Sequence, residues 1–239
     1  LNVAGTLVGL ETPLQSKNLE LKPYATTSVV TDKAATPRVF NDPTASAGFD
    51  FKYGITRGLI ADATVNTDFA QVEEDLQQVN LTRFSLFFPE KREFFLEGQG
   101  GFAFGGAPLD SSRGINREIP ILFFSRQIGL SQGQSVPVIA GGRVTGRSGA
   151  YSIGAINIQT AEKTSAGAPS TNFTIARVKR DILRRSSIGL ITTHRDPSGL
   201  GSSNTAGGFD ANFGFFQNVA MSGYYARSTM PAGRAGSNA

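Results

Sequence analysis

The dominant pattern along the chain is an alternation of apolar and polar residues with a period of two. In residues 58–69, the side chains at odd positions from Leu59 to Phe69 are mainly apolar, whereas Asp62 and Asp68 occupy even positions. Successive side chains of a β-strand point to opposite faces of a sheet, so this pattern predicts a strand with one apolar and one polar face. Comparable alternation predicts further strands at 18–30, 47–56, 136–146, 150–160, 172–181, 186–194, 209–217 and 218–228.

The segments between the predicted strands are of two kinds. Short polar segments at 145–150, 180–187 and Gln217–Asn218 predict hairpin turns. Longer segments rich in glycine, serine or proline predict loops at 31–46, 105–120, 160–171 and 195–208. Tight turns at one rim and long loops at the other are typical of an outer-membrane β-barrel. Charged residues on the polar faces fit a wet lumen, so the pattern favours such a barrel over a soluble β-sandwich or propeller.

Composition narrows the classes further. The 28 glycines and 18 phenylalanines among 239 residues suit β-structure with tight turns and disfavour a helical bundle. No run of about 18 uncharged apolar residues occurs, which excludes a transmembrane helix. Without cysteine and with one histidine, His194, the chain has no zinc ligand set. The net charge of +4 is dispersed and forms no basic face, so nucleic acid is excluded as a partner.

Residues 66–106 differ from the rest of the chain. They begin with a cluster of acids and amides formed by Asp68, Gln71, Glu73, Glu74 and Asp75. "VNLTRF" at 79–84 then leads to "FFPEKREFFLEG" at 87–98, in which four charged residues lie between two pairs of phenylalanines and a fifth, Glu97, follows the second pair. In these motifs the chain resembles a large family of bacterial outer-membrane proteins. In that family a barrel of unknown function follows an amino-terminal β-sandwich similar to family-9 carbohydrate-binding modules.

The resemblance implies a fold, a location and partners. The family's "VNPDFxQVExD" and "VNLTxFExFFPEKRPFFLEG" are matched closely, with local departures at Thr67, Ser85 and Glu93. An all-β, antiparallel, up-and-down transmembrane β-barrel in the bacterial outer membrane is therefore expected. Residues 1–239 would form one incomplete domain at the amino-terminal part of that barrel, with the segment around 66–106 folded inward. Expected partners are outer-membrane lipid and lipopolysaccharide, with a glycan or other envelope proteins as further candidates.

The charges of the inward segment are predicted to neutralise one another, because an unpaired buried charge is costly. On this interpretation they form an ion-pair and hydrogen-bond network that holds the segment against the barrel wall, with Arg143 also facing the lumen. The predicted network consists of Asn66, Asp68, Gln71, Glu73, Asp75, Glu90, Lys91, Arg92 and Glu97. The predicted aromatic anchors on either side are Phe87, Phe88, Phe94 and Phe95.

Other interpretations of the charged residues stay open. Glu73 with Asp75, or Glu90 with Glu97, could act as acid and base on a glycan. Asp68 and the acids at 73–75 offer oxygen ligands for Ca²⁺, although the spaced aspartates of a calcium loop are missing; no other metal or cofactor is expected. The basic residues of "RVKRDILRR" at 177–185 could meet lipid headgroups or lipopolysaccharide phosphates, or form a solvated hairpin.

The function predicted from these residues is that of an outer-membrane pore, anchor or transport-associated protein with a charged network inside it. The alternative is a cell-surface glycan-binding protein or hydrolase that uses the acidic cluster. Enzymatic activity is left undecided by the sequence, which favours a protein that is not an enzyme.

Overall fold

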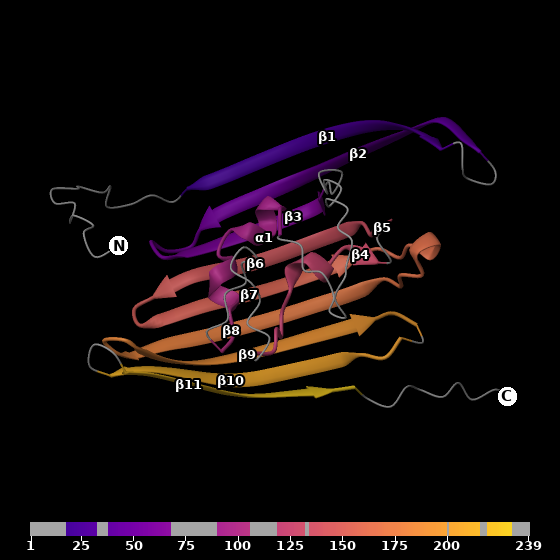
Figure 1. Ribbon diagram of the computed structural model, residues 1–239. Coiled ribbons are helices and arrows are strands. Elements are labelled where there is room, and N and C mark those ends of the chain that lie inside the picture. Colours follow the sequence, from indigo (N-terminus) through magenta and orange to yellow (C-terminus); the bar gives the residue numbers. More distant parts are fainter. Residues whose placement is uncertain are drawn as a thin grey trace.

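A nine-stranded antiparallel sheet is the main element of the computed structural model, which describes residues 18–32, 38–67, 90–105, 119–131, 134–199, 201–215 and 219–230. The strand order is β1-β2-β3-β6-β7-β8-β9-β10-β11 (Figure 1). The strands are β1 (Leu19–Asp32), β2 (Val39–Gly54), β3 (Leu59–Thr67), β6 (Val138–Ser148), β7 (Tyr151–Thr160), β8 (Thr171–Leu183), β9 (Ser186–Pro197), β10 (Asn204–Phe215) and β11 (Val219–Thr229). Sequence neighbours pair throughout except where β3 pairs with β6, which confirms the predicted antiparallel β-structure.

The prediction of a closed barrel is wrong, because the sheet is open. A barrel requires its first and last strands to pair, since closure is what removes the edges of a sheet. Within the described residues, β1 pairs only with β2 and β11 only with β10. The two edge strands lie at opposite borders of the sheet (Figure 1). Alternation in the sequence correctly predicted the strands, but it carries no information on whether distant edges meet.

Turns and loops follow the predictions in part. The hairpins β6–β7 and β8–β9 turn at Gly149–Ala150 and Arg184–Arg185, inside the predicted windows. However, β2 begins at Val39 and β10 at Asn204, so both strands start within segments that were predicted to be loops. The predicted turn at Gln217–Asn218 lies outside the described residues. No helix in the described part of the chain is long and apolar enough to cross a membrane.

Between β3 and β6 the chain forms an insert, by which we mean residues 90–105 and 119–131. It contains the helices α1 (Glu93–Leu96), η1 (Gln99–Phe102) and η3 (Ser125–Gln127), and the strand β4 (Leu130–Ser131), which pairs with β5 (Gln134–Ser135). Another short helix, η4 (Thr164–Ala166), connects β7 to β8. Gly98 links α1 to η1 with φ of 70°, a left-handed conformation that glycine adopts without strain. The insert lies on one face of the sheet, which we call the inner face (Figure 1).

The hydrophobic core lies between the insert and the inner face of the sheet. From the insert it receives Phe95, Phe102, Phe104, Phe123 and Ile128, and from the strands it receives Val138, Ile156, Ile158, Ile175 and Ile191. Burial of each such side chain contributes about 1.5–3 kcal/mol relative to exposure. The core therefore supplies an apolar part of the attachment of the insert to the sheet.

Three phenylalanines of the insert lie over glycines of the strands. A Cβ atom added at Gly154 would come within 2.8 Å of the Phe102 ring, and one added at Gly208 within 2.6 Å of the Phe104 ring. At Gly141 the added atom would meet the Phe94 ring at 3.4 Å, an ordinary contact distance. The rings of Phe102 and Phe104 thus approach the backbone of β7 and β10 more closely than would be possible if residues 154 and 208 carried side chains.

The two faces of the sheet differ sharply in charge. Strand alternation places Lys52, Asp62 and Arg143 on the inner face, under the insert. The opposite, outer face is apolar over the middle of the strands, and its charged residues Arg180, Asp196 and Arg227 lie near strand ends. Its exposed apolar side chains include Leu19, Leu21, Phe49, Val65, Val178, Leu190, Phe209, Met221 and Tyr225. The predicted division into an apolar and a polar face holds on β3, whereas on β6–β9 the inner face also carries the apolar core.

Candidate functional site

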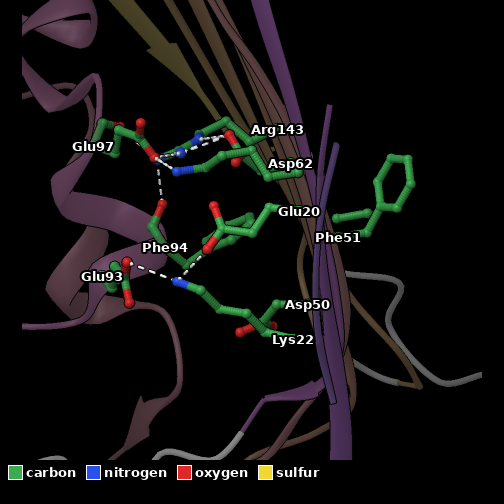
Figure 2. A pocket seen from close by; sticks show the side chains of 11 residues that line it. Glu20, Lys22, Asp50, Phe51, Asp62, Glu93, Phe94, Glu97 and Arg143 are labelled. Carbon is green, nitrogen blue, oxygen red and sulfur yellow. Dashed lines mark hydrogen bonds and ion pairs between the residues drawn. The ribbon is translucent and has the colours of Figure 1, made fainter. Parts of the chain in front are cut away.

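A single guanidinium group, that of Arg143 on β6, joins the insert to the sheet (Figure 2). Its Nη2 and Nε donate to Oδ2 of Asp62 on β3, at 2.6 and 3.1 Å. Nη2 also lies 3.2 Å from Oε2 of Glu97, and Nη1 donates to the backbone carbonyls of Phe94 and Glu97. Only 1% of the Arg143 side chain is exposed, so these bonds form away from water. One side chain therefore fixes both β3 and the end of α1.

Two lysines of the neighbouring strands extend this attachment. Lys52 on β2 lies 2.6 Å from Oε2 of Glu97. Lys22 on β1 lies 3.3 Å from Glu93 of α1 and 3.1 Å from Glu20 of its own strand (Figure 2). These lysine contacts are partly exposed, and exposed ion pairs contribute about 0–1 kcal/mol each. The lysine contacts therefore contribute little to the attachment of α1, which depends mainly on the buried contacts of Arg143.

A small cavity lies among these charges. Its volume of about 60 Å³ is far below the roughly 300 Å³ at which ligand pockets begin. Asp50 lines it and accepts a hydrogen bond of 2.6 Å from Oγ1 of Thr64. The charged residues around it are Glu20, Asp50, Asp62, Glu93 and Glu97 with Lys22, Lys52 and Arg143. The arrangement is suited to attaching the insert and leaves no room for a sugar.

A second cluster within the insert is formed by Glu90, Arg92 and Ser125. The Glu90 carboxylate is fully buried and accepts from Nε and Nη2 of Arg92, both at 2.7 Å, and from Oγ of Ser125 at 2.7 Å. Arg92 also donates to the carbonyls of Ser125 and Ile128, at 2.7 and 2.6 Å. The cluster joins the two halves of the insert, residues 90–105 and 119–131.

The two glutamates have lowered pKa values for different reasons. Burial alone would raise the pKa of Glu90, but the hydrogen bonds and charge of Arg92, with the hydroxyl of Ser125, lower it below its usual range. The pKa of Glu97 is lowered first by the hydrogen bond from Lys52, and then by the charge of Lys52 and Arg143. Both carboxylates are therefore held in their ionised form. A general acid needs a raised pKa, so neither glutamate has the property of one.

A third ion pair, between Arg177 on β8 and Asp210 on β10, lies under the insert. Arg177 Nη2 lies 2.9 Å from Asp210 Oδ2, and Nη1 donates to the other carboxylate oxygen. The side chains are 1% and 2% exposed, and the guanidinium lies 5.8 Å from the Phe104 ring. It spans β9 above Gly189, where a Cβ atom would lie 2.7 Å from the guanidinium nitrogens. The sequence analysis missed this pair, although alternation puts both residues on the polar face.

Residues 15–222 match the model of a protein family described as a domain of unknown function, DUF5916. The chain belongs to the DUF5916 family. No curated protein and no solved structure matches it. The family description states no activity, so any function of this DUF5916 domain has to be argued from the geometry above.

The predicted network is only partly assembled in the DUF5916 domain. Glu97 joins Arg143 and Lys52, whereas Glu90 and Arg92 form the separate cluster inside the insert. The Lys91 side chain is exposed, and its backbone N–H donates to Glu90. Asn66, with φ of 52°, donates from its amide to the carbonyl of Ala47 at 2.6 Å and belongs to neither cluster.

Several predicted residues cannot be compared with the structure. Asp68, Gln71, Glu73, Glu74, Asp75, Phe87 and Phe88 lie outside the described residues. Of the predicted aromatic anchors that are described, Phe94 and Phe95 pack edge to face at 5.2 Å, and Arg92 lies 4.2 Å from the Phe95 ring. No group of three or more acidic, histidine or cysteine side chains placed to hold a metal occurs among the described residues. The predicted calcium ligands are not in that part of the chain.

A larger cavity of about 450 Å³ lies beside the turn after α1. Glycines of residues 98–101 line one side, and Arg147, Lys179 and Asn212 line the other. Its volume falls within the range of small-molecule sites. Two described carboxylates line it, those of Glu97 and Asp210, and the second is paired with Arg177. The cavity has no second carboxylate of the predicted catalytic pairs.

The stability of the DUF5916 domain is expected to fall in acid. Because the pKa values of Glu90 and Glu97 are lower in the folded than in the unfolded chain, the unfolded chain binds more protons below the usual glutamate pKa of about 4.3. Their contribution is complete above that pH and is lost as the pH falls through the folded values. Urea unfolding at stepped pH measures this loss. Replacing Lys52 by methionine should move it to higher pH.

Lys179 provides the matched control for that experiment. It is another inner-face lysine, and no ion pair to it occurs among the described residues. Lys179→Met should leave the pH at which stability is lost unchanged. If Lys52→Met and Lys179→Met gave the same profile as the unmodified protein, the hydrogen bond from Lys52 would not be what lowers the pKa of Glu97.

Proposed function

We propose that the domain is an anchor in the bacterial outer membrane. In this proposal the outer face of the sheet contacts lipid acyl chains, and the inner face carries the charged insert away from lipid. The observation that supports it most strongly is the apolar, uncharged middle of the outer face. The resemblance of residues 66–106 to outer-membrane proteins supports the same location.

The apolar residues of the outer face form a band that crosses all the strands. On β1, β2 and β3 it includes the paired residues Pro23, Phe49 and Val65, and on β1 it extends to Leu19 and Leu21 towards the short turns. On β8, β9 and β10 it includes Val178, Leu190 and Phe209. On β10 and β11 it continues to the pairs Phe213–Met221 and Phe215–Val219. A continuous apolar band on the outward face is expected of strands that contact lipid.

Strand length fits this geometry. β6 and β11 each have 11 residues. At about 3.4 Å per residue and a tilt of about 45°, such strands rise roughly 26 Å, close to the thickness of the hydrocarbon layer. Strands of this length are therefore long enough to cross a bilayer core.

A polar boundary on the outer face supports the same placement. Towards the long connections, Asn157 on β7 donates to Asn172 Oδ1 and Thr174 Oγ1 of β8, at 2.9 and 2.7 Å. Asn172 in turn donates to Gln159 at 3.1 Å. On β9 and β10, His194 and Thr205 are joined at 2.8 Å. These groups can face water or headgroups, so they end the apolar band on that side.

The proposal makes one demand on the edges of the sheet. Backbone N–H and C=O groups cannot remain unpaired in hydrocarbon, where each costs several kcal/mol. The outward edges of β1 and β11 would therefore need hydrogen-bonding partners from other polypeptide segments whenever the domain is in a bilayer.

Vesicle flotation tests the proposal. The purified domain should float with phosphatidylcholine vesicles and resist extraction by alkaline carbonate. Leu190→Arg, in the middle of the band, should weaken this association by about 2–4 kcal/mol, because arginine at the centre of a bilayer is that unfavourable. Thr205→Arg, at the polar boundary of the same face, should have little effect.

Two results would contradict the proposed anchor. A domain that stays monomeric in buffer without detergent and does not float with vesicles would contradict the anchor. Equal effects of Leu190→Arg and Thr205→Arg would show that the apolar band is not the part in contact with lipid.

A further inference from the structure

The two ends of the sheet carry different charge. At the end with the short turns, the described residues include five arginines, Arg57, Arg147, Arg180, Arg184 and Arg185, and one acid, Asp181. At the other end, the described bases Arg38, Lys163, Arg195 and Arg227 are largely balanced by the described acids Asp42, Glu162 and Asp196. We call the five arginines at the first end the basic rim. Almost all of the excess positive charge of the sheet is gathered there.

Three arginines of the rim belong to the β8–β9 hairpin. Arg184 and Arg185 form its turn, are exposed, and have no ion-pair partner among the described residues. Arg180 is on the outer face, with its guanidinium 5.3 Å from the Tyr151 ring of β7. Arg147 pairs with Asp181, so the one acid at this end of the sheet neutralises Arg147 and not the arginines of the hairpin. The hairpin therefore presents a local excess of cations to its surroundings.

Exposed apolar side chains are interleaved with these cations. Ile182 and Leu183 directly precede Arg184 and are 37% and 59% exposed, and Tyr151 under Arg180 is 42% exposed. Arginine beside an amphipathic ring and exposed aliphatic groups is typical of the level where headgroups meet acyl chains. A free anion or a nucleic acid would gain nothing from the aliphatic side chains. The rim also adjoins the apolar band on β8 and β9, where Val178 pairs with Leu190.

We propose that the basic rim binds the phosphate groups of anionic phospholipids in the leaflet that borders the short turns. This inference rests on the proposed anchor and adds the lipid class that the anchor selects. The planar guanidinium group can donate two parallel hydrogen bonds to a phosphate, and its charge favours a surface rich in anionic lipid. Ile182 and Leu183 then enter the upper acyl region beside the bound headgroups.

The experiment compares vesicles of phosphatidylcholine with vesicles that also contain phosphatidylglycerol, at low salt. The domain should bind the mixed vesicles more tightly. The triple variant Arg180→Gln, Arg184→Gln, Arg185→Gln should lose roughly 100-fold in affinity for them, at about fivefold for each cation near an anionic surface. High salt should reduce this difference, because exposed charges are screened. Binding to phosphatidylcholine alone should be retained by the variant.

The matched control removes three arginines from the other end of the sheet. Arg38→Gln, Arg195→Gln, Arg227→Gln makes the same change in net charge and should leave the preference for phosphatidylglycerol intact. Equal losses of affinity in the two triple variants would contradict lipid binding by the basic rim, because the affinity would then depend only on the net charge of the protein. Displacement by millimolar inorganic phosphate would also overturn it in favour of a site for free phosphate.

The results with the two kinds of vesicle distinguish failure of the lipid preference from failure of the membrane anchor. Binding to both kinds of vesicle without any preference for phosphatidylglycerol would overturn the rim and leave the anchor standing. Failure to bind either kind would overturn the anchor and the rim together.

Discussion

Replacement of Asp210 by asparagine is expected to lower the free energy of unfolding by about 3–5 kcal/mol, because it leaves the buried guanidinium of Arg177 without a counter-charge. Arg177 cannot move into water, since its side chain lies between Gly189 and the ring of Phe104. Urea unfolding followed by circular dichroism measures the change. This variant should be among the least stable single substitutions in the sheet.

An exposed pair of the same residue types is the control for this substitution. Arg147 and Asp181 are 63% and 37% exposed, so Asp181→Asn should cost no more than about 1 kcal/mol. The double variant Arg177→Met, Asp210→Asn should recover much of the loss, because no buried charge remains. If Asp210→Asn and Asp181→Asn destabilised the protein equally, burial of the pair would not be the source of its energy.

Replacement of Arg143 by methionine is expected to destabilise the domain by about 3–5 kcal/mol and to release α1 from the sheet. The substitution leaves the buried carboxylate of Asp62 without its cation and the carbonyls of Phe94 and Glu97 without donors. Limited proteolysis should therefore cut within residues 90–105 under conditions where the sheet is still folded. Arg143→Lys should restore only part of the protection, because a lysine cannot reach these acceptors with a planar group.

Two further variants make this prediction specific. Adding Asp62→Asn to Arg143→Met should reduce the loss of stability, since the buried negative charge is removed as well. Arg227→Met removes an exposed arginine from β11 and should leave the insert protected. If Arg143→Met left the insert as resistant as in the unmodified protein, its attachment would depend on the phenylalanine core alone.

The sequence predicted the strands and their faces well, because both depend on local alternation. Lys52, Asp62 and Arg143 could be assigned to a polar face from the period of two alone. Whether the sheet closes could not be predicted in this way, since it depends on residues of β1 and β11 that are nearly 200 positions apart in the chain.

For the candidate site, the sequence predicted which residue types gather there but not how they pair. "FFPEKREFFLEG" showed that charges and phenylalanines gather between β3 and β6, and that the charges would need partners. It could not show that Glu90 pairs with Arg92 inside the insert while Glu97 pairs across it with Lys52 and Arg143. The Arg143–Asp62 pair joins residues 81 positions apart, and the Arg177–Asp210 pair joins residues 33 apart. Such pairings follow from strand register, which the charges themselves do not reveal.

The glycines beneath the rings of Phe102 and Phe104 help to specify where the insert lies on the sheet. They lie on two different strands, β7 and β10, so they leave two separate hollows in the inner face. If the insert moved sideways by one strand, its rings would meet Cβ atoms at positions where hollows now receive them. The shape of the inner face is thus complementary to the insert. The positions where the sheet has glycine, and therefore no side chain, determine where the insert can pack.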